Sequence, residues 1–283
     1  MEKNFKHGGL KTKTEDIKIC VLRVGGTNCD AETARAFQEL GAQTEIKHIN
    51  ELIKHGNLLD YNMLVLPGGF SFGDYVRSGV IFARSLNAKL GKQMSQFIDE
   101  SRPILGICNG FQILVEYGLL PGFEGADQYS QATLTTNIPQ GFKCKWVYLK
   151  NENKGNCLFT NKISQNKILK IPIAHGEGRF LFSVEKEKQL LEKLVDNDML
   201  VFRYCNEDGI LANGVYPANP NGAYHDIAGI CNKDGTIFGL MPHPERAMYW
   251  WQEPDWTNKT HITSYGDGKL IFENIISNIS KKQ

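Results

Sequence analysis

The chain of 283 residues has no long hydrophobic run, no excess of one charge and no paired cysteine motif. Its apolar stretches are only a few residues long, as at residues 63–66, whereas a membrane-spanning helix needs about 20. With 32 basic and 31 acidic residues, the net charge of +1 provides no general attraction to nucleic acid or anionic membranes. The first residues lack the apolar core of a signal peptide. We therefore expect a cytoplasmic protein with no nucleic-acid or membrane partner.

Cysteine is present, but its spacing is not that of a structural scaffold. The seven cysteines are odd in number, and no two have the C-x-x-C spacing of many zinc and disulfide sites. We expect no metal site, and most of these thiols are predicted to be small buried side chains in a reducing compartment. With 41% hydrophobic and 22% charged residues, a chain of this length can bury a core without disulfides or metals.

Strand and helix signals alternate through the first half of the sequence. Short apolar stretches are bounded by turn residues, and most are followed by segments with helical character. Asp30 stands where the N-cap of the first helix is expected, and Gly41 where that helix should end. The alternation predicts an α/β fold with a mostly parallel sheet and helices on both faces. The predicted strands are residues 17–24, 43–49, 63–66 and 103–107, and the predicted helices are 31–40, 78–89, 93–101 and 109–117.

The second half contains short strand candidates separated by loops rich in glycine, asparagine and proline. This pattern predicts antiparallel strands added to the same sheet rather than a second domain. We expect an N-terminal extension at residues 1–15 and one domain at residues 16–283. An aromatic stretch at residues 248–267 is predicted to be a surface insertion, before a closing helix at 268–280. The predicted strands here are residues 143–149, 168–174, 200–204, 227–231 and 236–240.

One cysteine stands in a context that points to chemistry. Cys108 lies between a predicted buried strand and a predicted helix, with Gly106 and Gly110 on either side. Small residues there permit a tight, strained turn that lifts the side chain above the strand ends, where open α/β sheets bind ligands. The N-terminus of the following helix favours a thiolate. We interpret Cys108 as a nucleophile, the alternative being a small buried side chain.

A thiol nucleophile needs a base and a group that orients the base. His243 and Glu245 lie in one short Met-Pro-His-Pro-Glu-Arg loop after the last predicted strand. In an extended segment their side chains project to the same side, so the carboxylate can fix the tautomer of the proton-carrying imidazole. The alternative is a turn histidine beside a proline.

Attack on an amide creates an oxyanion, which two converging N–H groups can stabilise. The backbone N–H of Asn109, at the start of the predicted helix, is one candidate donor. The backbone N–H of Gly69, in a glycine-rich loop after another predicted strand, is the second. The alternative for this loop is an ordinary tight turn.

Several segments together resemble a known family. The elbow at 106–112, the string LPGGFSFGDY at 66–75 and the string MPHPERA at 241–247 are similar to those of class I glutamine amidotransferases. Within this class the chain resembles the glutaminase subunit of phosphoribosylformylglycinamidine synthase, from purine biosynthesis. The narrower likeness rests on TNCD at 27–30, FSFGDY at 70–75, CNGFQ at 108–112, GLLPG at 118–122 and AHGEG at 174–178.

The resemblance implies a role for each matching residue. Cys108 corresponds to the nucleophile, His243 to the base and Glu245 to the partner that orients the base. Gly69 and Asn109 match the positions whose backbone N–H groups form the oxyanion hole. The implied fold is a flavodoxin-like domain, and the implied reaction is hydrolysis of L-glutamine to glutamate and ammonia through a cysteinyl thioester.

Further positions are implied to lie at the glutamine pocket. Gln112 matches a residue that helps hold the substrate, and His175 and Glu177 lie in a family string near it. For His175, a hydrogen-bonded residue at a sheet edge is the alternative. Gly25 and Ser78 stand where many relatives have proline and cysteine, and neither change removes a triad group.

The resemblance also implies partners. The ammonia would pass to a separate synthetase subunit, with a small bridging subunit in the complex. The synthetase would use ATP and magnesium to convert formylglycinamide ribonucleotide to its amidine. No cofactor is expected in this chain, which has no G-x-x-x-x-G-K-[ST] phosphate loop.

Two other hypotheses use the same residues differently. A stand-alone hydrolase or peptidase could apply the Cys-His-Glu triad to γ-glutamyl conjugates without a partner. A non-catalytic ligand-binding protein of this fold could cradle a phosphate at residues 25–28, although the complete G-x-G-x-x-G spacing is absent.

Overall fold

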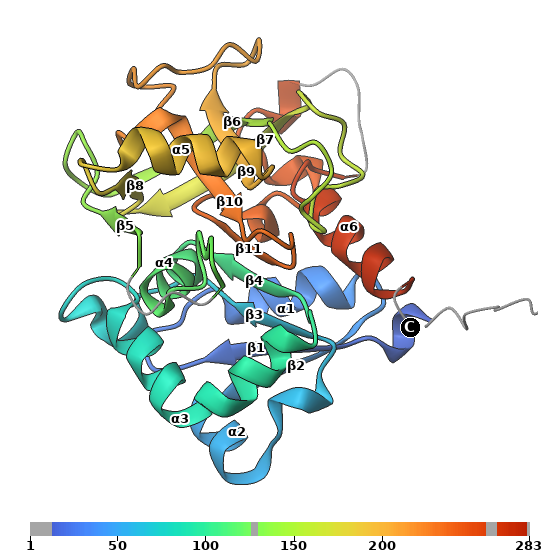
Figure 1. Cartoon of the computed structure of the whole chain (residues 1–283). Coiled ribbons are helices and arrows are strands. Elements are labelled where there is room, and N and C mark those ends of the chain that lie inside the picture. Colours follow the sequence, from blue (N-terminus) through green and yellow to red (C-terminus); the bar gives the residue numbers. More distant parts are fainter. Residues whose placement is uncertain (1–12, 126–129, 259–264, 282–283) are drawn as a thin grey trace, which may run out of the picture.

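The computed structural model describes residues 13–125, 130–258 and 265–281 (Figure 1). In these ranges nine strands form one sheet in the order β2-β1-β3-β4-β11-β10-β9-β6-β7, and β5 and β8 form a separate antiparallel pair. The strands are β1 (Lys18–Arg23), β2 (Gln43–His48), β3 (Met63–Leu66), β4 (Ile104–Ile107), β5 (Ala132–Thr135), β6 (Lys143–Asn151), β7 (Ile168–His175), β8 (Arg179–Phe182), β9 (Leu200–Cys205), β10 (Ile227–Cys231) and β11 (Ile237–Leu240). The helices are α1 (Asp30–Gln38), α2 (Ile49–His55), α3 (Val80–Asp99), α4 (Asn109–Tyr117), α5 (Glu187–Asp196) and α6 (Lys269–Ile279).

The parallel half of the sheet contains the strands predicted from the first half of the sequence. β1 pairs in parallel with β2 and β3, β3 with β4, and β4 with β11. Every residue of β3 and β4 is buried, as expected for strands covered by helices on both faces. α1 contacts α6 through Phe37 and Phe272, whose ring centroids are 4.8 Å apart, and α3 packs against α4 (Figure 1). The predicted parallel α/β core is confirmed.

The other half of the sheet is antiparallel. β11, β10, β9, β6 and β7 follow one another in antiparallel pairs, so the prediction of strands added to the same sheet is confirmed. α2, α5, β5 and β8 were not predicted. β5 and β8 have only four residues each, and α5 is a polar helix that buries only Leu190 and Leu194. Four-residue strands carry little hydrophobic periodicity, whereas the helical spacing of Leu190 and Leu194 in α5 was a signal that the prediction did not use.

Two local predictions are wrong. The helices expected at 78–89 and 93–101 are one continuous helix, α3, because its buried face continues through Gly91 at helical spacing. Asp30 is not an N-cap: Cys29 occupies that position without a side-chain cap bond, and Asp30 pairs instead with Arg23 at 3.0 Å. The buried face of α3 is formed by Phe82, Ala83, Leu86, Leu90, Met94 and Phe97.

The expected extension and insertion lie partly outside the described residues. Of the extension, residues 14–16 form a single 3-10 turn before β1. Of the stretch at 248–267, the described part contains 3-10 turns at Trp250–Gln252 and Trp256–Asn258, and the rings of Trp250 and Trp256 lie 5.3 Å apart. None of the helices in the described ranges has the length and apolarity needed to cross a membrane.

Candidate active site

The turn at Cys108 has the strained backbone expected of an elbow. β4 ends at Ile107, α4 begins at Asn109, and Cys108 between them has φ +51° and ψ −104°. Residues other than glycine rarely adopt such a φ, and this kind of strain is concentrated at functional sites. The Cys108 N–H donates to the Leu240 carbonyl at 2.8 Å, which ties the turn to β11. The thiol is nearly buried, with Sγ 3.7 Å from the Ala174 carbonyl oxygen.

Glycine is required on both sides of this elbow. A Cβ at Gly106 would lie 2.6 Å from the Gly110 carbonyl oxygen, and a Cβ at Gly110 would lie 1.8 Å from the Leu66 carbonyl oxygen. A side chain at either position would therefore push α4 away from the strands. The two glycines allow the N-terminus of α4 to lie at the strand ends beside the thiol, where its dipole favours negative charge.

His243 and Glu245 form a buried pair beyond the end of β11. Nδ1 of His243 lies 2.6 Å from Oε1 of Glu245, and the two residues are 2% and 3% exposed. The sequence argument expected this contact in an extended segment, and that part is wrong. Residues Pro244–Arg246 form a 3-10 turn, which proline at its first position favours, and the turn brings the carboxylate back to the ring.

Each residue of this pair also has one side-chain atom without a protein partner. Nε2 of His243 and Oε2 of Glu245 are buried, and neither makes a hydrogen bond to any described residue. Burial disfavours the imidazolium, but the Glu245 carboxylate and the nearby Cys108 and Cys29 thiols raise the pKa of His243 well above its usual value. An imidazole held at one nitrogen and unpaired at the other can take up a proton and return it.

The glycine-rich loop after β3 lies directly beside the elbow. A Cβ at Gly68 would lie 2.8 Å from Cε1 of His243 and 3.5 Å from Cβ of Cys108. Gly69 has φ +147°, and a Cβ there would lie 2.7 Å from the Asn28 backbone nitrogen. The Asn28 N–H donates to the Gly68 carbonyl at 3.3 Å and anchors the loop. Two connections at neighbouring strand ends thus meet at the thiol.

The two expected oxyanion donors lie at this end of the sheet. Within the described ranges, the N–H groups of Gly69 and Asn109 donate no hydrogen bond. The Asn109 side chain accepts from the Ser71 N–H at 3.3 Å and donates to Oε1 of Gln112 at 3.0 Å. It therefore links the loop after β3 to α4.

Gln112 and Glu177 are brought together. Nε2 of Gln112 donates to the Glu177 carbonyl at 2.6 Å, so Gln112 positions the segment after β7. The Glu177 carboxylate accepts from the Ser78 N–H at 3.2 Å, and the Ser78 hydroxyl donates to Asp74 at 2.9 Å. Burial raises the pKa of Asp74, the Ser78 bond opposes this, and Glu177 adds to it. Two acidic side chains thus lie together near the elbow.

His175 lies at the end of β7, the edge strand of the sheet. Its Nδ1 is 3.2 Å from Oδ1 of Asn137, and a Cβ at Gly178 would lie 2.1 Å from its Cε1. Burial, together with the charge of His243, lowers the pKa of His175 to about 3, so the ring is neutral at pH 7. These contacts favour the alternative given above for His175, in which it is a hydrogen-bonded residue at the edge of the sheet.

Cys29 is a residue of this site that the sequence argument missed. Its Sγ, a nitrogen of His243 and a carboxylate oxygen of Glu245 lie within 4.8 Å of one another. Arg246 donates to Sγ at 3.1 Å and pairs with Glu32 at 2.8 Å. Burial raises the pKa of Cys29, and the neighbouring His243 opposes this. One sequence signal was available, because Cys29, like Cys108, directly precedes a helix that follows a buried strand.

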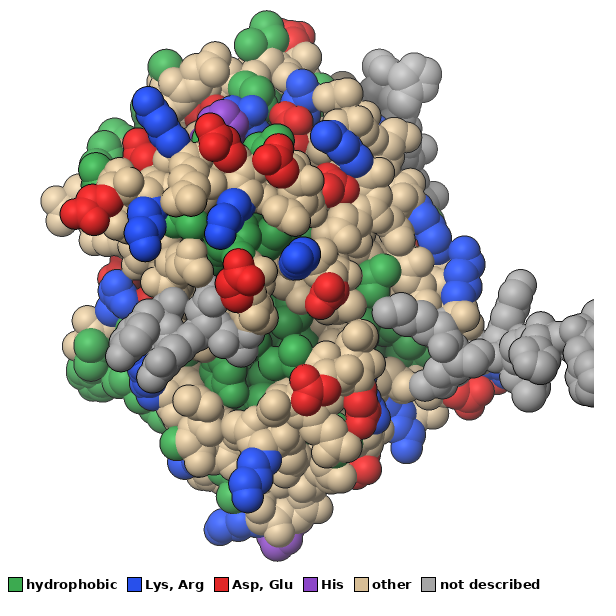
Figure 2. All heavy atoms as spheres, in the orientation of Figure 1, with side chains coloured by type: hydrophobic (Ala, Val, Ile, Leu, Met, Phe, Trp, Pro, Cys, Tyr) green, Lys and Arg blue, Asp and Glu red, His purple; other side chains and the backbone are tan. Residues whose placement is uncertain are grey.

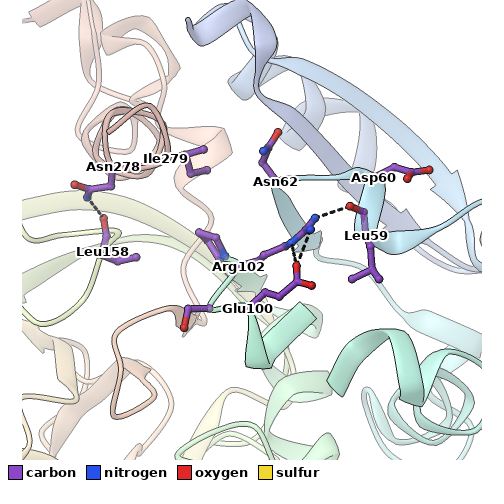
Figure 3. Close-up of a pocket in the computed structure, with 10 residues that line it drawn as sticks. Leu59, Asp60, Asn62, Glu100, Arg102, Leu158, Asn278 and Ile279 are labelled. Atoms are coloured by element: carbon purple, nitrogen blue, oxygen red, sulfur yellow. Dashed lines mark hydrogen bonds and ion pairs between the residues drawn. The ribbon is translucent and has the colours of Figure 1, made fainter. Parts of the chain in front are cut away.

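A cavity of about 490 Å³ lies at the opposite end of the parallel strands (Figure 3). Its lining includes Asn62 and Pro103, which directly precede β3 and β4. Arg102 donates to the Leu59 carbonyl at 2.6 Å and to Glu100 at 2.7 Å, and Asn278 donates to a backbone carbonyl (Figure 3). Its lining has no cysteine or histidine. The surface also shows no dominant charge on the face drawn in Figure 2, where acidic and basic side chains are interspersed.

The fold and this site together define a class I glutamine amidotransferase. The family model of a CobB/CobQ-like glutamine amidotransferase domain matches residues 16–278. A glutamine amidotransferase from Thermotoga maritima shares the fold at a TM-score of 0.55 and 14% identity, with 94% of this chain and 99% of that chain covered.

More similar relatives narrow the assignment. The chain is 42% identical over 277 residues to phosphoribosylformylglycinamidine synthase subunit PurQ of Archaeoglobus fulgidus, covering 94% of this chain and 98% of that protein. It is 46% identical over 265 residues to PurQ of Methanococcus maripaludis, covering 93% of each. A chain in the structure of PurLQS from Thermotoga maritima is 33% identical, with a TM-score of 0.68 and coverage of 93% and 99%. The chain belongs to the family of PurQ glutaminase subunits, which confirms the resemblance found in the sequence.

Proposed function

We propose that this chain hydrolyses L-glutamine to glutamate and ammonia, with Cys108 as the nucleophile, and supplies the ammonia for phosphoribosylformylglycinamidine synthesis. One observation carries the proposal: Cys108 on its strained elbow meets the buried His243–Glu245 pair at the loop that contains Gly68. Residues 16–283 act as one amidotransferase domain in this proposal. The stand-alone hydrolase and the non-catalytic binder fit the family relationship less well.

The first half of the reaction forms a thioester. The Cys108 thiolate attacks the side-chain amide carbon of glutamine, and the negative charge moves to the amide oxygen. The N–H groups of Gly69 and Asn109 stabilise this oxyanion; one such donor contributes about 3–4 kcal/mol in a comparable site. His243 gives its proton to the departing nitrogen, and ammonia leaves as the γ-glutamyl thioester forms.

The second half releases glutamate. His243, now neutral, takes a proton from water, and the hydroxide attacks the thioester carbonyl. A second oxyanion forms in the same place and collapses to glutamate and the Cys108 thiolate. Glu245 keeps the imidazole in the required tautomer in both halves, through the 2.6 Å contact with Nδ1.

Acidic side chains beside the elbow suit the other end of the substrate. Asp74 and Glu177 lie close enough for the charge of Glu177 to raise the pKa of Asp74. Oδ1 of Asp74 is buried and makes no hydrogen bond to any described residue. The α-ammonium group of glutamine would neutralise this negative region, and Gln112 positions Glu177 for it. His175 takes no part in proton transfer in this scheme.

The ammonia is consumed by a partner. We infer a complex with a synthetase subunit and a small bridging subunit, in which the synthetase uses ATP and magnesium. Exposed apolar side chains lie beside the site: Phe70 follows Gly69, and its ring is 6.2 Å from that of Phe142. Tyr75 is 89% exposed in the loop between Asp74 and Ser78. Apolar side chains exposed together in this way are typical of protein interfaces.

Cys108→Ala tests the catalytic assignment. A complex that contains this variant should make no amidine with glutamine as the nitrogen source. It should still make amidine with ammonium salts, because only the source of ammonia is lost. Product formation with each nitrogen source, measured side by side with wild type, gives the answer. Failure with ammonium despite normal assembly would place Cys108 in the synthetase chemistry or the subunit interface instead.

Labelling gives an independent readout. A glutamine-analogue electrophile should form a single adduct on Cys108, detected by mass spectrometry of the digested protein. Cys144, the exposed thiol, is the internal control. An adduct on Cys144 or Cys29 with Cys108 unmodified would overturn the site assignment.

The interface has its own test. Phe142→Asp should weaken binding to the purified synthetase subunit, measured by sedimentation. Ile53→Asp is the matched control, because Ile53 is also an exposed apolar residue but lies on α2. Equal binding by both variants would show that the exposed apolar residues beside the site are not the docking face.

A further inference from the structure

Three side chains at the active site have the chemistry of a transition-metal site. Cys29 offers a sulfur, His243 a nitrogen and Glu245 an oxygen, and these atoms lie within 4.8 Å of one another. Zinc is bound in proteins by this mixture of donors, at about 2.0–2.3 Å from each. Tetrahedral ligands at those lengths are about 3.4 Å apart, so movements of about 1 Å would close the cluster around an ion.

The donors are buried, and part of their binding capacity is unused. Cys29, His243 and Glu245 are each no more than 3% exposed. Nε2 of His243 and Oε2 of Glu245 make no hydrogen bond to any described residue. Nδ1 of His243 is held by Oε1 of Glu245, and histidines that bind metals are usually oriented by a carboxylate in this way.

Cys108 offers a further donor beside Gly68. A Cβ at Gly68 would lie 3.0 Å from Sγ of Cys29, 2.8 Å from Cε1 of His243 and 3.5 Å from Cβ of Cys108. These three side chains therefore converge on Gly68. An ion on Cys29 and His243 could recruit the Cys108 thiolate or a water as a further ligand. The ion could reach this cluster by the same route that glutamine must take to Cys108.

Cys29 has no role in the proposed hydrolysis that would exclude this use. Its sulfur accepts a hydrogen bond from Arg246 at 3.1 Å, and that guanidinium is held by Glu32. The chain thus places a second thiol against the histidine that serves the first.

We propose that this cluster binds a thiophilic divalent cation such as Zn²⁺ through Cys29 and Nε2 of His243, with Glu245 orienting the imidazole, and that the bound ion stops glutamine hydrolysis. The inhibition rests on the proposed glutaminase function, because it consists of removing His243 from proton transfer. Binding of the ion does not depend on that function. The cluster is thus an inhibitory metal site within the active site.

Metal binding is measured first, without reference to activity. Wild type and Cys108→Ala, freed of metal by a chelator, are titrated with Zn²⁺ against a chromogenic indicator, and with Co²⁺ by absorption spectroscopy. Both should bind one ion, and Co²⁺ should give a sulfur-to-metal charge-transfer band. Cys29→Ser and Cys29→Ala should lose the band and bind Zn²⁺ at least about 10–100-fold more weakly. Circular dichroism checks that each variant is folded. Serine is polar and alanine is not, so if one Cys29 variant fails to fold, the other can be measured in its place.

Cys144→Ser is the matched control, since Cys144 is the exposed cysteine of the chain. It should bind both ions like wild type. A charge-transfer band that disappears in Cys144→Ser and persists in the Cys29 variants would place the ion on the surface. A band that depends on Cys108 alone would place it on the catalytic thiol. Either result overturns the proposal.

Inhibition is measured second. Glutaminase activity of the wild-type chain, in its complex, should fall with Zn²⁺ in the range that fills the site, and a chelator should restore it. Each Cys29 variant is compared with its own rate without zinc and should need at least about 10–100-fold more Zn²⁺ for the same fractional loss. Equal sensitivity would overturn the inhibitory role. A chain with Cys29-dependent cobalt absorption but no glutaminase activity would refute the proposed function and retain the metal site.

Discussion

The two ends of the parallel strands differ in how their buried polar groups are paired. At the carboxyl ends, His243 and Glu245 each retain a buried atom with no hydrogen bond to a described residue. At the amino ends, the cavity of about 490 Å³ is lined by groups such as Arg102 and Asn278, whose donors are bound to carbonyls and a carboxylate.

This difference shows why cavity size alone does not identify the site. An unpaired buried polar atom costs about 1–3 kcal/mol. Such a cost is retained where it is needed for chemistry, as we argue for the buried His243–Glu245 pair. In the amino-end cavity, by contrast, the donors of Arg102 and Asn278 are paired with protein acceptors. The predictions below test this contrast, from the largest effect to the smallest.

Substitution of the pair at the carboxyl end should have the largest effect. His243→Asn removes the group that transfers the proton and should lower kcat by about 10⁶-fold, as in comparable triads. Glu245→Gln removes only the group that orients the ring and should lower kcat by about 10⁴-fold. Glutamate release, with thermal unfolding as the control for folding, measures both. A His243→Asn chain that kept most of its activity would refute the triad.

Gly68 and Gly25 provide a matched pair of test positions. They lie in the connections after β3 and β1, which hydrogen-bond to each other. A Cβ at Gly68 would lie 2.8 Å from Cε1 of His243, whereas a Cβ at Gly25 would meet nothing within 4 Å. Gly68→Ala should therefore displace the ring and lower kcat/KM about 100-fold, the usual cost of a misplacement of about 1 Å. Gly25→Ala should leave kcat/KM unchanged. Similar losses in both would show that loop flexibility, rather than the close approach, sets the rate.

Much of this end could be predicted from the sequence, because its signals are local. The elbow depends on Gly106, Cys108 and Gly110, which are close in the chain, and burial on both faces gives β3 and β4 uninterrupted apolar sequences. The His243–Glu245 contact was also expected, although its backbone was not. His243 is the N-cap of the 3-10 turn and Glu245 lies within it, and the sequence pattern did not distinguish this backbone from an extended segment.

The remaining features depend on contacts between distant segments. Cys29 enters the site because the connection after β1 packs against the loop after β3, and no local pattern records that packing. α3 was expected as two helices, at 78–89 and 93–101, whereas its buried face is continuous through Gly91. The low pKa of His175 arises from burial and from His243, which lies 68 residues away in the sequence.

At the amino ends the prediction concerns stability. Arg102→Ala removes charged hydrogen bonds to the Leu59 and Tyr61 carbonyls and leaves Glu100 without its ion pair. The free energy of unfolding should fall by about 1.5–3 kcal/mol, and kcat should not change. Urea unfolding and glutaminase assays measure the two quantities. Lys92→Ala, at an exposed basic residue, should change stability by less than about 0.5 kcal/mol. A loss of kcat in folded Arg102→Ala would link this end of the sheet to catalysis.

The smallest predicted effect concerns acid, and it returns to the carboxyl ends. Burial, together with the charge of His243, lowers the pKa of His175 to about 3, whereas the unfolded chain binds this proton near pH 6.5. Between these values the unfolded state holds more protons, so stability falls as the pH falls. The raised pKa of His243 also stabilises the folded state, and this stabilisation is present in full below pH 6.5. It therefore adds no pH dependence to the stability between pH 6.5 and 3.

His175→Gln should therefore reduce the acid sensitivity of the fold. Between pH 6.5 and 5, wild type should lose up to about 2 kcal/mol more stability than the variant, measured by urea unfolding. His55→Gln, at an exposed histidine, should follow wild type. Parallel curves for wild type and His175→Gln would mean that the ring accepts a proton without unfolding. In that case His175 would belong with the proton-transferring groups of the site rather than with the packing of the sheet edge.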